Sequence, residues 1–252
     1  MCTVSWIHED GGYQIFCNRD EKLTRRPATD PQLLCRDGVR FLAPIDADAG
    51  GTWIATNEFG VTVCLLNGAL EVEPQASDAR RSRGLIVLDL ASAASIQEVQ
   101  ARVWQADLQP YEPFTLVALE TGQHATVIEW SGVETRILPY GEPYMPLVSS
   151  SFDPEAVRAR RRGQLAELTG SAGVLNPVSL LVFHQSHWPE RGPYSPCMHR
   201  ADAETVSFSW VTVTDAEASF YYSAGPPCRT LTGESYTLAL RQEDSVLCLA
   251  CC

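Results

Sequence analysis

The sequence lacks an excess of basic residues and any long apolar run. Its 252 residues carry 19 lysines and arginines against 31 aspartates and glutamates, which gives a formal net charge of −12. Nucleic acids and anionic membranes attract basic surfaces, so neither is expected as a partner. No stretch reaches the roughly eighteen uninterrupted apolar residues that a membrane-spanning helix needs. We therefore expect a small-molecule substrate, no nucleic-acid partner and no integral membrane segment.

Signals for secretion, serine catalysis and phosphate binding are also missing. A secretory leader needs a basic start and an apolar core, whereas residues 9–12 (EDGG) interrupt the apolar residues near the N-terminus. We therefore expect a cytoplasmic protein, in which most of the nine cysteines are reduced and buried. The serines at 149–151 lack the G-x-S-x-G setting of a nucleophile elbow, and there is no glycine-rich phosphate loop.

Among the residues that are present, Cys2 is the most informative. Removal of Met1 would leave a thiol and a free α-amine on the same residue. An α-amine titrates at about 7.7 to 8.0 and a thiol near about 8.5, so a modest influence from the site would populate an amine and thiolate pair. The thiolate could attack an amide or ester carbonyl while the amine relays the proton, as in the threonine and N-terminal amine pairing.

Residue patterns place charged partners near this cysteine. Residues 3–7 and 13–18 predict two strands around a turn at 10–12, which would bring Cys2 and Arg19 to the same end of a sheet. Arg19 would then hold the thiolate by charge, and Asp20 or Glu21 would fix the ammonium. Residues 53–56 and 61–66 predict a second hairpin that ends at Asn67 and Gly68, where a backbone N–H can be exposed. Asn67 is therefore the first expected oxyanion donor.

The rest of the chain alternates between strand and helix patterns. Helices are expected at 81–94, 95–105, 154–168 and 177–184, and strands at 114–120, 126–130, 134–138, 205–214 and 218–223. Ser95 is the expected N-cap of the second helix, with Glu98 completing a capping box. Loops at 24–43, 68–81 and 187–200 are expected to form pocket walls. This order predicts an α+β fold.

Two further clusters carry chemistry-bearing side chains. Arg158, Arg160, Arg161 and Arg162 lie in one predicted helix and are expected to form a solvated face. A second set could ligate zinc and consists of His184, His187, Cys197 and His199. Its spacing matches no standard zinc finger, so no metal and no cofactor is expected.

Several motifs recur in order in the N-terminal part of the chain. They are the opening Cys2, residues 18–21 (NRDE), 26–28 (RPA) and 50–54 (GGTWI) ahead of Asn67. Together they resemble the NRDE family (transport and Golgi organisation protein 2-like), a branch similar to N-terminal nucleophile (Ntn) hydrolases such as bile-salt hydrolase and penicillin V acylase. Residues 195–199 (SPCMH) and 225–228 (GPPC) resemble isopenicillin N acyltransferase-like proteins. The resemblance implies one Ntn-hydrolase-like domain over residues 1–252, with two antiparallel sheets flanked by helices in an αββα sandwich.

The resemblance also implies a set of site residues. Cys2, Arg19, Asp20 and Asn67 are the expected catalytic residues, and the further substrate or oxyanion candidates are Asn18, Glu21, Ser150 and Ser151. Relatives carry an asparagine where this chain reads VSSSF at 148–152; a serine hydroxyl can donate one hydrogen bond but rotates freely. The related amidases usually read Arg-Asn-x-Asp, so the partner of Arg19 is left open between Asp20 and Glu21.

Three classes of function follow from these residues, and a zinc-binding domain is the least favoured of them. The first is an N-terminal cysteine amidohydrolase or acyltransferase that acts on a non-peptide C–N amide or ester bond of a small molecule. The second is a non-catalytic carrier of an apolar ligand such as haem or an acyl lipid, with Cys2 as a ligand or a vestige. Retention of Cys2, Arg19 and Asp20 favours the first, and serine in place of the oxyanion asparagine favours the second. The sequence leaves the substrate and homo-oligomerisation open.

Overall fold

The chain folds as two stacked antiparallel sheets in a computed structural model that describes residues 2–68, 80–172, 175–229 and 232–242. Within these residues, six strands form one sheet in the order β10-β1-β2-β11-β12-β13, and seven form the other in the order β3-β4-β5-β6-β7-β8-β9. The first sheet consists of β1 (Cys2–Glu9), β2 (Gly12–Lys22), β10 (Leu147–Ser149), β11 (Ala203–Val213), β12 (Glu217–Ala224) and β13 (Glu234–Ala239). The second consists of β3 (Gln32–Arg36), β4 (Val39–Ala43), β5 (Ile54–Asn57), β6 (Thr62–Asn67), β7 (Phe114–Leu119), β8 (Thr126–Trp130) and β9 (Thr135–Leu138).

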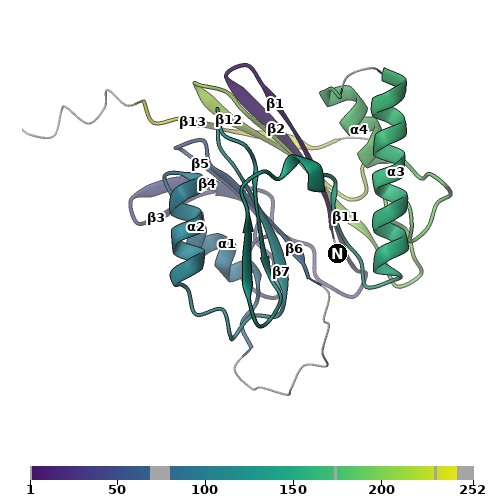
Figure 1. Cartoon of the computed structure of the whole chain (residues 1–252), viewed down its shortest axis with the longest axis horizontal. Coiled ribbons are helices and arrows are strands. Elements are labelled where there is room, and N and C mark those ends of the chain that lie inside the picture. The colour runs from purple at the N-terminus through teal and green to yellow at the C-terminus, as the bar shows by residue number, and fades with distance from the viewer. Residues whose placement is uncertain (1, 69–79, 173–174, 230–231, 243–252) are drawn as a thin grey trace, which may run out of the picture.

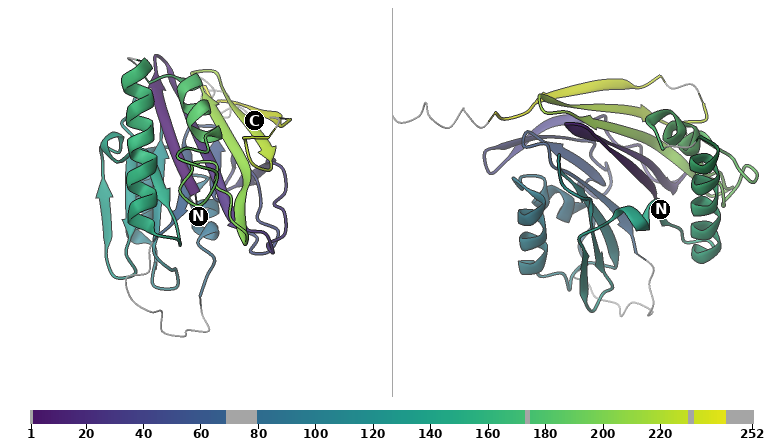
Figure 2. Two further views of the ribbon diagram at one scale, coloured as in Figure 1. Left: turned by 90° about the vertical axis from the view of Figure 1, so that its right-hand side faces the viewer. Right: turned by 45° about the horizontal axis from the view of Figure 1, so that its top comes forward.

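Helices cover the outer face of each sheet (Figures 1 and 2). Helices α1 (Gly84–Leu90) and α2 (Ile96–Gln105) pack on the seven-stranded sheet, and α3 (Pro154–Ala172) and α4 (Pro177–Gln185) pack on the six-stranded sheet. A short 3-10 helix spans Glu142–Tyr144. No helix within the described ranges has the length and apolarity needed to cross a bilayer.

Three apolar clusters hold the four layers together. The cluster between the two sheets includes Val4, Ile15, Ile54 and Val117. The cluster under α1 and α2 includes Val63, Leu65, Ile86, Leu90 and Val99. The cluster under α3 and α4 includes Phe16, Leu165, Leu180, Phe183 and Phe208. Because successive strand residues point to opposite faces, Ile15 and Phe16 of β2 belong to different clusters. The predicted αββα sandwich is therefore confirmed.

Most predicted elements are present, with differences in the loops. The hairpins at the start of the chain and at 53–66 are observed, and Ser95 caps α2 by accepting a hydrogen bond from the Glu98 amide. The prediction of a loop at 24–43 is wrong for its second half, which forms the β3–β4 hairpin. Strand β3 is mostly exposed on both faces, so its sequence lacks the apolar alternation that marks a half-buried strand. Of the predicted pocket loop at 68–81, residues 69–79 lie outside the described residues.

His184 is a buried neutral histidine in the cluster under α3 and α4. Its ring stacks on Phe16 with centroids 5.9 Å apart, and its Nε2 lies 2.8 Å from Ser5 Oγ. Burial, together with the nearby positive charge of Arg161, lowers the pKa of His184 to about 3. The ring is thus a structural member of the core.

Acidification is expected to destabilise the protein through His184. The unfolded chain binds a proton near pH 6.5, whereas the folded chain binds it only near pH 3, so the stability present above pH 6.5 is lost as the pH falls. Between pH 7 and pH 5 this one group should remove about 2 kcal/mol from the free energy of unfolding. Urea unfolding across this range measures the slope. His184→Gln should flatten it, and an unchanged slope in that variant would contradict the assignment.

Candidate active site

Cys2 begins the strand β1 and lies between two neighbouring strands of its sheet. It pairs directly with Arg19 on β2 and with Ser149 on β10. The predicted proximity of Cys2 and Arg19 is therefore confirmed. The backbone nitrogen of Cys2 donates a hydrogen bond to Ser149 Oγ at 2.9 Å, and the residue is 5% exposed.

A cavity of about 120 Å³ opens beside this cysteine between the ends of the two sheets. The first sheet and the residues that follow β2 contribute Cys2, Arg19, Asp20, Glu21 and Arg25, and the second sheet and its connections contribute Asp46, Gly51, Thr52, Trp53, Leu65, Asn67, Ser82, Arg83 and Gly84. All four predicted catalytic residues and Glu21 line this one space. The fold thus brings together predicted residues that lie up to 65 positions apart in the chain, as from Cys2 to Asn67.

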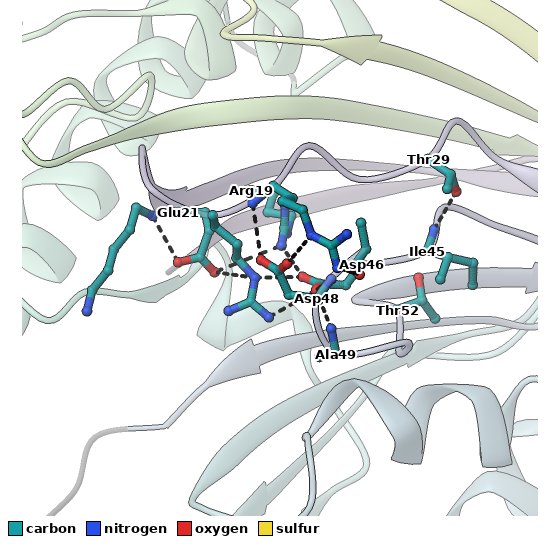
Figure 3. A network of polar contacts seen from close by, with 12 residues as sticks. Arg19, Glu21, Thr29, Ile45, Asp46, Asp48, Ala49 and Thr52 are labelled. Atoms are coloured by element: carbon teal, nitrogen blue, oxygen red, sulfur yellow. Dashed lines mark hydrogen bonds and ion pairs between the residues drawn. The ribbon is translucent and has the colours of Figure 1, made fainter.

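Asp46 holds two of the three arginines that line the cavity (Figure 3). Its Oδ2 accepts from Arg19 Nη2 at 2.5 Å and from Arg25 Nε at 2.8 Å, while Oδ1 accepts from Arg25 Nη2 at 3.0 Å. Burial opposes ionisation of Asp46, but hydrogen bonds from Arg25 and the Ala49 amide outweigh it and lower the pKa. The Arg19 guanidinium also lies over the Trp53 ring at 4.4 Å. Arg19 is therefore fixed from two sides.

The partner of Arg19 is a residue that the sequence did not indicate. The choice was left open between Asp20 and Glu21, but Glu21 Oε2 lies 3.9 Å from Arg19 and the closest carboxylate is that of Asp46. Asp46 stands in a loop without a strand or helix pattern. A signal was nevertheless present, because the run of aspartates at 46 and 48 follows a buried strand and precedes the GGTWI motif.

The glycines of that motif allow a close approach of two segments. A Cβ on Gly51 would lie 2.5 Å from the carbonyl carbon of Gly84, and the Thr52 amide donates to the Gly84 carbonyl at 3.1 Å. Gly50 adopts φ +67°, which favours glycine. The motif therefore places Thr52, Trp53 and the start of α1 against the cavity.

Asp20 belongs to a second, fully buried charged group. Its Oδ1 accepts from Thr205 Oγ1 at 2.6 Å, and its Oδ2 lies 3.5 Å from Arg161 Nη1. Burial raises the pKa of Asp20, and the charge of Arg161 with the Thr205 hydrogen bond partly opposes that rise. Arg161 also donates to Thr3 Oγ1 and to the Pro193 carbonyl, so it links β1 to the loop after α4.

The prediction of a solvated arginine face is wrong for one of its members. Arg158 and Arg160 are exposed, but Arg161 is 1% exposed and reaches into the protein. It lies four residues after Val157 and four before Leu165, both buried, which places it on the apolar stripe of the helix. That spacing was the available signal.

Comparison with known proteins now identifies the family. A family model described as Transport and Golgi organisation 2 matches residues 1–166. The chain belongs to the TANGO2 family. The match covers the strands that carry Cys2, Arg19 and Asp20, the segment of Asp46 and the helix position of Arg161. The comparison with curated proteins gives no match.

Solved structures similar to this TANGO2-family chain share its fold at low identity. A C2A mutant of the conjugated bile acid hydrolase from Clostridium perfringens is 11% identical, with a TM-score of 0.56 over 94% of this chain and 96% of that one. Penicillin V acylase from Agrobacterium tumefaciens is 11% identical, with 0.53 over 95% and 86%. The Caenorhabditis elegans ortholog of N-acylethanolamine-hydrolyzing acid amidase is 14% identical, with 0.57 over 83% and 92%. These likenesses show an Ntn-hydrolase fold.

The remaining candidates of the TANGO2-family chain divide between the cavity and its surroundings. Asn67 ends β6 at the cavity, while the Gly68 N–H donates to the Pro113 carbonyl at 2.8 Å and is therefore already used. The side-chain amide of Asn67 is thus the donor to consider there. Asn18 lies outside the cavity lining and donates from Nδ2 to the His184 and Pro196 carbonyls, both at 2.9 Å.

Of the serines at 149–151, Ser149 is the one bonded to Cys2. Ser150 Oγ donates to the Phe152 carbonyl at 2.6 Å and accepts from the Phe152 amide at 3.1 Å, so its hydroxyl serves its own turn. Ser151 is exposed. Neither Ser150 nor Ser151 lines the cavity, and their oxyanion role remains a prediction.

The thiol of Cys17 contacts the sulfur of Cys2. A hydrogen bond with the Cys17 thiol and then burial raise the pKa of Cys2 well above its usual value in the chain that retains Met1. Cys17 Sγ in turn lies 3.9 Å from Cys64 Sγ. The unprocessed chain therefore holds Cys2 as a protonated thiol.

Proposed function

We propose that this protein is an N-terminal cysteine amidohydrolase or acyltransferase that acts on a non-peptide C–N amide, or an ester, of a small molecule. The observation that carries the proposal is the position of Cys2. It lies at the wall of a cavity opposite Arg19, with its backbone nitrogen hydrogen-bonded to Ser149. The Ntn-hydrolase fold supports the same chemistry but does not by itself imply it.

Activation depends on the removal of Met1. With Met1 attached, the nitrogen of Cys2 is an amide and cannot accept a proton, and the raised pKa keeps the thiol protonated. A freed α-amine titrates at about 7.7 to 8.0 and can take that proton. Ser149 Oγ, which accepts from this nitrogen, would orient the amine toward the sulfur. Removal of Met1 therefore supplies the base that deprotonates the Cys2 thiol.

The steps of the reaction follow from these groups. The Cys2 thiol gives its proton to its own amine, and the thiolate forms a bond to the substrate carbonyl carbon. The side-chain amide of Asn67 is the proposed donor to the negative oxygen that develops. The tetrahedral species collapses, the C–N bond breaks, and the ammonium of Cys2 returns its proton to the leaving nitrogen. Water or another acceptor then attacks the thioester and frees Cys2.

The second charged group positions the reacting residues. Asp20 and Arg161 are buried side by side, and Arg161 bonds the Thr3 hydroxyl next to Cys2. Arg19 lines the cavity and forms an ion pair with Asp46. We assign Asp20 and Arg161 to positioning, and Arg19 to electrostatic stabilisation of the thiolate or of the bound substrate.

The cavity favours a hydrolase over an apolar carrier. Pockets that hold a whole drug-sized ligand have volumes of about 300–1,000 Å³ and mostly apolar walls. The cavity of the described residues is about 120 Å³, and its lining includes three arginines, three carboxylates and an asparagine, with Trp53 and Leu65 as the large apolar side chains. This space suits the polar reacting end of a substrate rather than a haem.

Mass spectrometry of the purified protein, expressed without an N-terminal tag, tests the proposal. We expect an intact mass that lacks one methionine, and an added acyl group on Cys2 after brief treatment with a p-nitrophenyl ester. Peptide mapping would locate the acyl group. A protein that keeps Met1 in every preparation, or acylation at another residue, would refute the proposal.

Ser149→Ala is expected to weaken catalysis without unfolding the protein. Loss of the acceptor for the Cys2 nitrogen would misorient the base, and we expect kcat/KM toward the p-nitrophenyl ester to fall by about 10-fold or more, within the range that general-base effects span. The pH dependence of kcat/KM should shift as well. Ser131→Ala is the matched control, because that exposed hydroxyl bonds its own turn between β8 and β9, away from the cavity lining. Equal activity of the two variants would contradict the role of Ser149.

A further inference from the structure

Four metal-binding side chains meet at the end of the six-stranded sheet, away from the cavity lining. The ligand atoms of His187, Cys197, His199 and Cys228 all lie within 4.8 Å of one another. The residues come from the loop after α4, from the segment that leads into β11, and from the connection between β12 and β13. Segments up to 41 positions apart, as from His187 to Cys228, thus converge on one point.

The distances in this cluster match those of a tetrahedral zinc site. His199 Nε2 lies 3.6 Å from Cys197 Sγ and 3.4 Å from Cys228 Sγ. With Zn–S near 2.3 Å and Zn–N near 2.0–2.1 Å, tetrahedral ligands have N···S separations of about 3.5–3.6 Å. The arrangement therefore needs little adjustment to hold the ion.

The fourth candidate ligand is the Nε2 nitrogen of His187. Nε2 of His187 is buried and has no hydrogen-bond partner among the residues that the structure describes. Its ring lies 5.1 Å from that of His199, centroid to centroid. A buried polar atom without a partner is costly, and a metal ion would satisfy it.

A carboxylate orients the other histidine from behind. Nδ1 of His199 lies 3.3 Å from Glu204 Oε2, which leaves Nε2 to face the two sulfurs. A carboxylate on the remote nitrogen of a metal-bound histidine is a recurrent feature of zinc sites, since it fixes the tautomer. Two arginines lie next to this pair. Arg191 Nη2 is 3.4 Å from His199 Nδ1, and Arg229 Nη2 is 3.4 Å from Glu204 Oε2.

From this geometry we propose that His187, Cys197, His199 and Cys228 bind one zinc ion in a structural site. The set considered from the sequence contained His184, which is not at this site, and lacked Cys228. His184 is buried against Phe16 and bonded to Ser5, and the fourth ligand is Cys228, 29 residues beyond His199. Four protein ligands leave no open position, so the ion acts as a cross-link rather than as a Lewis acid.

The cross-link would secure the loop that supports Asp20. Met198, between two of the ligands, donates its amide to Thr205 Oγ1 at 2.9 Å, and Thr205 donates to Asp20. Arg161 reaches the same loop at the Pro193 carbonyl. Zinc would thus fix the segment at 186–199, although the site does not depend on what reaction the cavity performs.

Metal analysis of the full chain tests the proposal. We expect about one zinc per chain in protein purified in a reducing buffer without chelator. Removal of the zinc and addition of one equivalent of Co²⁺ should give the intense visible bands of a tetrahedral ion and a thiolate-to-cobalt charge-transfer band. Failure of the wild-type protein to bind one equivalent of either metal would overturn the site. A Cys197–Cys228 disulfide that persists in protein purified in the reducing buffer would overturn it as well.

Matched variants assign the ligands. Cys228→Ser, at a partly exposed loop position, should lose the stoichiometric zinc and, with it, the thiolate-to-cobalt charge-transfer band, while Cys35→Ser, at an exposed cysteine on β3, should keep both. Equal zinc in the two variants would overturn the assignment. Glu204→Gln should retain the stoichiometry but lower the zinc affinity by about 10- to 100-fold. An unchanged affinity in Glu204→Gln would contradict the orienting carboxylate.

Discussion

Cys2→Ala is expected to abolish acylation and turnover of a p-nitrophenyl ester. The sulfur is the proposed nucleophile, and removal of a nucleophile from a covalent mechanism lowers kcat/KM by at least about 10⁴-fold. Alanine is also small enough for removal of Met1, so the variant keeps the same free α-amine and differs only by the thiol. Initial rates and intact masses of both proteins give the measurement.

The control for this result is another cysteine. Cys35 is exposed on β3 and lies outside the cavity lining, so Cys35→Ser should turn over the ester like the unsubstituted protein. Turnover by Cys2→Ala at more than a few per cent of the normal rate would remove Cys2 from the mechanism. Zinc content should be unchanged in Cys2→Ala, so failure of the proposed chemistry and failure of the zinc site are separate outcomes.

Asp20→Ala is expected to cause the largest loss of stability. It would leave the Arg161 guanidinium buried without a carboxylate and would deprive the Thr205 hydroxyl of its acceptor. Breaking one side of a buried ion pair costs about 3–5 kcal/mol, because the remaining charge stays desolvated. Urea unfolding measures the change in the free energy of unfolding. If the variant is too unstable for a urea titration, the fall in its Tm measures the loss instead.

Two comparisons give this prediction its specificity. Arg158→Ala removes an exposed arginine of the same helix and should change the free energy of unfolding by less than about 0.5 kcal/mol. Replacing both partners, in Asp20→Ala with Arg161→Met, should recover much of the loss, because no uncompensated charge is left. A double variant that is as unstable as the sum of the two single variants would show that the pair is not coupled.

Local patterns carried much of the fold prediction. The alternation in β1, β2, β5 and β6 and the cap at Ser95 are short-range features, and each element formed where its pattern indicated it. Strands β3, β4, β10 and β13 were missed because they are short or exposed, and pairing with neighbours rather than their own sequence fixes them. The four-layer arrangement came from the family resemblance.

The predictions for the candidate active site likewise divide into those that a local pattern supports and those that it does not. Cys2 and Arg19 could be placed together because one hairpin register links them, and Asn67 could be placed at a strand end. Asp46 and Arg161 could not, since each reaches its partner across a boundary between layers or loops that no local pattern encodes. Three of the four proposed zinc ligands were in the set considered from the sequence, and Cys228 was missed because it comes from a separate connection.

The sequence by itself determined the α+β class and the pairing of Cys2 with Arg19 through strand periodicity, and the family through its motifs, because both are properties of neighbouring residues. The sandwich followed from the family resemblance. Tertiary structure alone decided that Asp46 holds Arg19, that Asp20 faces Arg161 and that two histidines and two cysteines converge on one point. Those contacts join segments whose separation along the chain carries no regular spacing, so they exist only once the sheets and helices have packed.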